Sequence, residues 1–133
     1  MSFKKYSEIM KKLFYLNNFD ERKYFYKIFL KKKDLKKLHK LNHKIGLHSH
    51  SHPISMEGIS HKNQLREFKL NQEKLSEILG INKDKINSMS HPYGRYNKDT
   101  LKILTKLGID IGFKEHNYID NNMKKINNSD LEI

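Results

Sequence analysis

The chain contains no cysteine, which excludes disulfide bonds and thiolate zinc sites but leaves the redox compartment open. Long apolar runs are missing too, because no stretch approaches the ~20 residues that a membrane-spanning helix needs. Near the N-terminus, the apolar run is only Leu13 to Leu16, which is too short for the core of a secretory signal. We therefore expect no membrane span and a cytoplasmic location.

Arginine is scarce, although the chain is strongly basic. Of its 27 basic residues only Arg22, Arg66 and Arg95 are arginines, and the formal net charge is +12. Such a charge favours nucleic-acid binding when the cations gather on one face with aromatic side chains between them. Here lysines are spread over every predicted helix, and Asn and Ile are frequent, which is typical of AT-rich coding sequence. We expect weak attraction to polyanions and no specific nucleic-acid partner.

The remaining composition is that of one small globular protein. A chain of 133 residues can bury a single core. Its 36% hydrophobic and 11% aromatic residues are more typical of a folded chain than of a disordered one. No internal repeat or low-complexity linker interrupts the sequence.

Helical spacing of apolar residues dominates the first part of the chain. It predicts one helix over Phe3 to Leu16, a second capped by Asp20, and a third opened by Asp34. The aromatic residues of these helices are expected to form core contacts. We divide the chain into an N-terminal helical region, residues 1–34, and a second domain, residues 35–133.

From Lys44 onward, short apolar runs alternate with helical patterns. The runs predict strands at 44–48, 86–90 and 109–113, with one more near Lys124 to Asn127. The periodic segments predict helices at about 60–79, ending at Gly80, and at 98–107, capped by Asn97. Such alternation implies parallel strands joined by right-handed crossovers.

Three histidines crowd into five positions directly after the first predicted strand, in the segment His48-Ser49-His50-Ser51-His52-Pro53. Imidazole is the commonest metal ligand near neutral pH, and two imidazoles at one strand end make half of a zinc or iron site. The alternative is a solvent-exposed, histidine-rich turn. The glycine before the cluster and the proline after it fix the backbone, which favours the metal site.

A second motif, Ser90-His91-Pro92-Tyr93-Gly94, follows the predicted strand 86–90. In parallel sheets the loops that leave the carboxyl ends of the strands lie at one edge and carry the functional site. The two motifs occupy such loops on successive strands. The predicted topology therefore brings them together.

The segments Ile45-Gly46-Leu47-His48-Ser49-His50-Ser51-His52-Pro53 and His91-Pro92-Tyr93-Gly94 together resemble the polysaccharide deacetylases, the NodB-homology family of carbohydrate esterases. The first matches the family's His-Ser/Thr-x-x-His metal motif through His48 and His52, and the second is similar to its Arg-x-Pro-Tyr/Phe-Gly motif. The resemblance covers about residues 35–113. It implies an α/β fold, part of a deformed (β/α) barrel with parallel strands, preceded here by N-terminal helices.

The resemblance also implies a chemistry: a metal-dependent hydrolase that removes acetyl groups from N-acetylated sugars or polysaccharide. His48 and His52 would hold a divalent metal, zinc by preference, and Tyr93 would offer its backbone N–H to the oxyanion. Pro92 and Gly94 would shape the turn that meets the substrate. His91 is open to two interpretations, a substitute ligand or acid in a variant site, or only a turn residue.

The sequence departs from the family pattern in three places. The Asp-Asp motif that supplies the base and the third metal ligand is absent, and the nearest string, Asn18-Phe19-Asp20-Glu21, lacks the paired aspartates and the glycine. Ser90 replaces the arginine of the Pro-Tyr-Gly motif, and the late catalytic histidine has no counterpart. We expect a truncated barrel domain. It is either an incomplete enzyme, or a catalytically inactive remnant or a subunit completed by another polypeptide, with the metal-binding histidine pair retained. We also expect either a homo-oligomer or a complementing chain.

Overall fold

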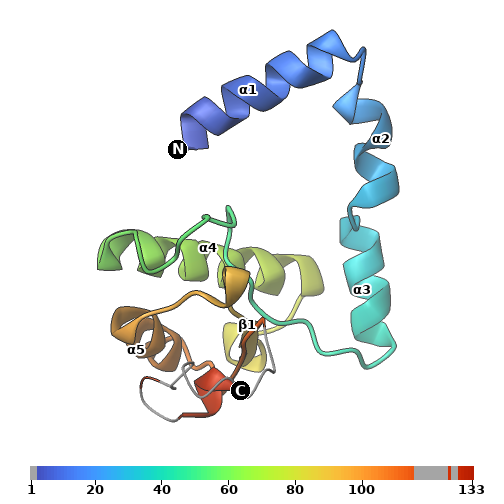
Figure 1. The fold of residues 1–133 in the computed structure, drawn as a ribbon. Coiled ribbons are helices and arrows are strands. Elements are labelled where there is room, and N and C mark those ends of the chain that lie inside the picture. Colours follow the sequence, from blue (N-terminus) through green and yellow to red (C-terminus); the bar gives the residue numbers. More distant parts are fainter. Residues whose placement is uncertain (1–2, 116–125, 127–128) are drawn as a thin grey trace. The chain divides into compact units, whose positions relative to one another are not determined.

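The computed structural model describes residues 3–115, 126 and 129–133 (Figure 1). The chain divides into two compact units, Met1–Asp34 and Leu35–Ile133, which are described separately below. The described part is mostly helical and contains a two-stranded parallel sheet. This architecture is less rich in strands than the barrel segment expected from the sequence. The assignment of the two ranges as domains stays a prediction.

The first unit contains α1 (Phe3–Leu16), α2 (Glu21–Ile28) and the beginning of α3 (Lys32–Lys40). Asp20 caps α2 as predicted, because its side chain accepts a hydrogen bond from the backbone N–H of Arg22 at 3.0 Å. The expected start of α3 at Asp34 is wrong. The helix begins two residues earlier, and Asp34 in its first turn accepts a hydrogen bond from the Lys31 backbone N–H at 2.9 Å.

Two helices, α4 (His61–Leu79) and α5 (Lys98–Lys106), pack against each other in the second unit (Figure 1). Gly80 ends α4 with φ at 69°, a left-handed conformation that glycine adopts without a steric penalty. Asn97 and Thr100 form a reciprocal capping box at the start of α5. Both predicted helix ends are therefore confirmed. Across the described helices, none is long and apolar enough to cross a bilayer.

The sheet of the second unit consists of β1 (Ser88–Ser90) and β2 (Ile111–Phe113), which run parallel with Met89 opposite Gly112. The predicted strand at 44–48 is wrong, because only Leu47 pairs, through an isolated parallel bridge to Met89. The residue two positions later, Ser49, has φ at 76°, so the chain leaves the extended conformation just after this bridge. The strand expected near 124–127 falls almost entirely outside the described residues.

Short 3-10 helices complete the second unit: η1 (Lys83–Lys85), η2 (Pro92–Gly94) and η3 (Asp130–Glu132). The C-terminal residue Ile133 lies beside β2, where its backbone N–H donates to Gly112 O at 2.9 Å and its carbonyl accepts from Lys114 at 2.7 Å. The core consists of Leu47, Met56, Phe68, Leu75, Ile86, Met89, Leu101, Ile103, Leu104, Ile109 and Leu131. It holds both motif-bearing loops against α4 and α5.

Candidate functional site

The loop after Leu47 folds back on itself and brings two histidine rings together. Ser49 is buried, and its side-chain oxygen accepts a hydrogen bond from the His52 backbone N–H at 3.1 Å. His52 also has a positive φ, 53°, which is uncommon for a residue other than glycine. The centroids of the His48 and His52 rings lie 4.8 Å apart with 50° between the ring planes. The spacing of the two histidines thus produces a pair of adjacent imidazoles.

His48 is oriented from both of its ends. Its ring Nδ1 lies 2.8 Å from the carbonyl oxygen of Ser90, and its backbone N–H donates to Asn71 Oδ1 at 2.9 Å. A carbonyl only accepts, so Nδ1 donates in this hydrogen bond, and Nε2 is the ring nitrogen that remains for a ligand. A hydrogen bond from one ring nitrogen to a carbonyl is how proteins orient histidines that bind metals.

The second motif meets the first at Tyr93. This residue has φ at 53° within η2, and its half-exposed ring packs edge-on against His52, with 4.8 Å between the ring centroids. Around it, Gly94 donates to His91 O at 2.9 Å and Arg95 donates to Pro92 O at 3.0 Å. Among the hydrogen bonds of the described residues, none uses the Tyr93 backbone N–H. The rings of His48, His52 and Tyr93 therefore lie one after another, next to the Tyr93 backbone N–H, which is available to donate a hydrogen bond.

The helix α4 holds the histidine loop through a side chain that sequence reasoning missed. Glu67 Oε2 accepts from the backbone N–H groups of His50 and Ser51 at 3.0 and 2.7 Å. Glu67 Oε1 accepts from the Ser51 hydroxyl at 2.8 Å. Together with Asn71 one turn later, Glu67 fixes the loop from both sides of Ser49. No spacing rule connects these helix positions to a loop 16 to 23 residues earlier.

His91 occupies a different environment from the histidine pair. Its ring is buried, stacks on Tyr96 with 4.4 Å between centroids, and places Nε2 2.7 Å from Leu131 O. Burial lowers the pKa of His91, and this outweighs the hydrogen bond to Leu131 and the nearby Glu132, both of which raise it. Nδ1 is buried and finds no hydrogen-bond partner within the described part of the chain. The ring thus contacts the core and the C-terminal segment.

The buried carboxylate of Glu132 also joins the C-terminal residues to the second motif. Glu132 is fully buried, and its carboxylate accepts hydrogen bonds from the Tyr96 hydroxyl at 2.9 Å and from the Ser129 hydroxyl at 3.1 Å. Burial, followed by the hydrogen bond to Glu132, raises the pKa of Tyr96 above its ordinary value. These contacts fasten the C-terminal residues next to η2 and support the position of the Tyr93 turn.

Two of the described side chains are placed so that they could hold a metal ion. His48 and His52 are adjacent, and His48 has a free ring nitrogen, which fits two ligand positions. Over the described ranges, no three His, Cys, Asp or Glu side chains are grouped so that they could hold a metal ion. Asp20 caps α2 in the first unit. His48 also lines an open hollow of about 520 Å³ beside the sheet, whereas His52 does not border it.

Comparison with known proteins gives two matches. A family model described as polysaccharide deacetylase matches residues 5–112, which extends the resemblance into the N-terminal helices. Among solved structures, the chain is similar to the Streptococcus pyogenes deacetylase PplD in complex with acetate, with 27% sequence identity and a TM-score of 0.58. The alignment covers 64% of this chain and 36% of the streptococcal one, so the match spans about a third of that protein. No curated protein matches the chain.

Proposed function

The chain belongs to the polysaccharide deacetylase family, and on this premise we propose that it is a metal-dependent hydrolase of N-acetylated carbohydrate. Water would cleave the carbon–nitrogen bond of an acetamido group, releasing acetate and leaving a free amine on the sugar. The observation that carries the proposal is the meeting of His48, His52 and Tyr93, from two loops, within ring contact. In this proposal the second unit is part of a deformed (β/α) barrel.

His48 and His52 are the proposed metal ligands. The hydrogen bond from His48 Nδ1 to Ser90 O fixes the ring and leaves Nε2 as the nitrogen for the metal, and the Ser49 turn holds His52 next to it. A divalent metal ion bound there, zinc in our proposal, would supply Lewis-acid activation of the acetyl carbonyl and of water. The chain's own contribution is to hold the two imidazoles in one orientation before the ion arrives.

Tyr93 is the proposed oxyanion donor and substrate contact. Its backbone N–H is free of other hydrogen bonds in the described structure, so it can donate to the oxygen that gains negative charge when water adds to the acetyl carbon. Pro92 and Gly94 hold the turn on either side of it. The exposed Tyr93 ring provides a wall next to His52 for the acetyl group. His91 is buried behind this turn and acts by supporting it.

A second candidate function is a protein that keeps the histidine pair but does not turn over substrate alone. One observation favours it: over the described residues, two candidate metal ligands come together rather than three. Loss of a general base typically slows such reactions by about 10²–10⁴-fold. In this case another polypeptide, or a second copy of the chain, would supply the base and the third ligand.

Metal binding tests the proposal directly. Zinc titrated into the full chain against a chromophoric chelator should bind, and binding should be lost in His48→Ala and in His52→Ala. His43→Ala is the matched control, because His43 is also exposed and precedes the loop by a few residues. Equal zinc binding by the wild type and both loop variants would refute the assignment.

Acetate release then separates the two candidates. The zinc-loaded chain is incubated with short oligomers of N-acetylglucosamine, and acetate is measured with and without His48→Ala. Acetate release that disappears in the variant supports the hydrolase. Tight zinc binding without any acetate release supports the incomplete protein.

A further inference from the structure

One face of α4 carries three cations that lie outside the candidate site. Lys62, Arg66 and Lys69 occupy positions i, i+4 and i+7, so they lie on one side of the helix over about 10 Å. All three are exposed, and within the described residues none of them forms an ion pair. The nearest acid along this face, Glu73, pairs with Lys83 at 3.0 Å. The face therefore has a net positive charge.

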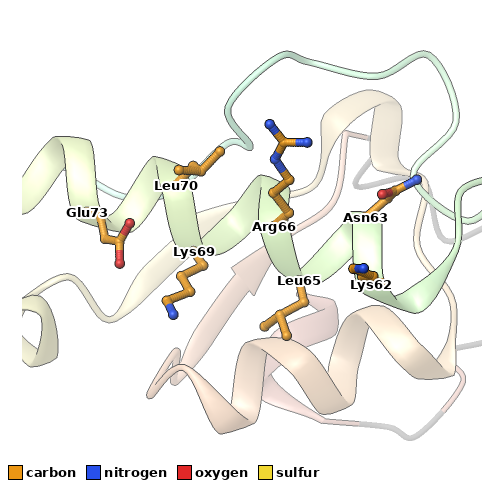
Figure 2. A pocket seen from close by; sticks show the side chains of 7 residues that line it. All are labelled: Lys62, Asn63, Leu65, Arg66, Lys69, Leu70 and Glu73. Carbon is orange, nitrogen blue, oxygen red and sulfur yellow. The ribbon is translucent and has the colours of Figure 1, made fainter.

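The three cations border a groove. An open hollow of about 600 Å³ is lined by Lys62, Asn63, Leu65, Arg66, Lys69, Leu70 and Glu73 (Figure 2). A second hollow, of about 450 Å³, shares Asn63, Arg66 and Leu70 with the first and reaches His50 and Ser51 of the histidine loop. Because they share these three lining residues, the two hollows together mark a path along α4 toward the loop that carries His48 and His52, with Glu67, which is hydrogen-bonded to that loop, at its far end. Arg66 stands where they join.

We propose that this path binds the carboxylate groups of an acidic, N-acetylated polysaccharide while one of its acetamido units occupies the site at His48 and His52. The inference rests on the proposed function and names the class of substrate. Leucine side chains in the lining supply apolar surface for the faces of sugar rings, and the cations supply complementary charge. A path that extends along a helix suits a polymer better than a single sugar.

The presence of an arginine on this face distinguishes it from the lysines that are spread over the rest of the chain. The chain has only three arginines, and in the second unit Arg95 lies 3.5 Å from Glu57 whereas Arg66 has no ion-pair partner among the described residues. A guanidinium binds a carboxylate through two parallel hydrogen bonds, which an ammonium does not do. Arg66 therefore has the chemistry expected at the centre of a carboxylate site.

The test is a binding measurement on the full chain. One probe is a hexasaccharide of alternating N-acetylglucosamine and glucuronic acid, and the other is the neutral hexamer of N-acetylglucosamine. Affinities are compared for the wild type, for the groove variant Lys62→Gln/Arg66→Gln/Lys69→Gln, and for a control variant. The control, Lys85→Gln/Lys102→Gln/Lys106→Gln, removes the same charge from exposed positions that do not line either hollow.

We expect the wild type and the control to prefer the acidic probe. The groove variant should bind it roughly tenfold more weakly, because each exposed ion pair contributes modestly, and should bind the neutral probe unchanged. The preference should also shrink at high salt. Absence of binding to the acidic probe, equal affinity for both probes, or equal loss in both variants would overturn the inference. So would tighter binding, through the same residues, of single-stranded DNA of matched charge.

These outcomes are independent of the proposed hydrolysis, since zinc binding and acetate release are measured separately. A groove-dependent preference without acetate release would leave the binding site standing and refute the deacetylase activity. Acetate release without any preference for the acidic probe would support the deacetylase activity and refute the carboxylate-binding path.

Discussion

Removal of the Glu67 carboxylate should weaken metal binding without unfolding the protein. Glu67 accepts three hydrogen bonds from the histidine loop, at 2.7 to 3.0 Å, and they come from His50 and Ser51 between the two proposed ligands. In Glu67→Ala the loop loses these contacts, and the two imidazoles must be ordered when the metal binds. The cost of this ordering should appear as a lower affinity.

The magnitude follows from the number of bonds and from their exposure. A hydrogen bond to a charged group contributes about 1.5–3 kcal/mol when buried. Glu67 is only partly buried, so water replaces much of what is lost, and we expect about 1.5 kcal/mol in total. Since about 1.4 kcal/mol corresponds to a tenfold change in an equilibrium constant, the zinc dissociation constant should rise about tenfold. Groups that orient metal ligands typically contribute about 10–100-fold to affinity.

Zinc titration against a competing chelator gives the affinity, and amide hydrogen exchange reports the order of the loop. Glu67→Ala should speed exchange at His50 and Ser51, while Glu67→Gln, which keeps one acceptor oxygen, should lie between it and the wild type. Glu73→Ala is the control, because Glu73 lies on the same helix and pairs with Lys83, and within the described ranges it forms no hydrogen bond with the loop. A Glu67→Ala affinity within about twofold of the wild type, or an equal loss in the control, would refute the reasoning.

Three further predictions concern stability and assembly. Burial lowers the pKa of His91, so below about pH 6.5 the unfolded chain binds more protons than the folded one. The free energy of unfolding should therefore decrease as the pH is lowered through this range. Urea unfolding at pH 7.5 and 5.5 should show a smaller fall in His91→Gln, and an identical fall would contradict this. Gly112→Ala should lower the free energy of unfolding by about 1–3 kcal/mol in urea, because the added Cβ would clash with the backbone oxygen of Leu131; an unchanged unfolding midpoint would show that the C-terminal segment can move away at little cost. If the second unit is part of a barrel, its strand edges should promote self-association in sedimentation experiments; a strictly monomeric chain would argue that the fold closes itself.

The sequence by itself determined the features that depend on neighbours along the chain. Asp20 and Asn97 cap their helices, and Gly80 ends α4, because each makes or permits backbone contacts within a few residues. The spacing of His48 and His52 is likewise a feature that depends on neighbours along the chain. The turn that joins them is closed by a hydrogen bond spanning three residues, so the pair could be found from the motif alone.

Only the tertiary structure decided the features that depend on distant parts of the chain. The length of a strand is set by its partner, so the apolar run before His48 forms a single bridge at Leu47. The His91 ring turns into the core because Leu131, 40 residues later, accepts its hydrogen bond. Glu67 reaches back 16 and 17 residues to hold the histidine loop. Such contacts form only when the core packs, and helical or strand periodicity, which describes one element at a time, carries no information about them.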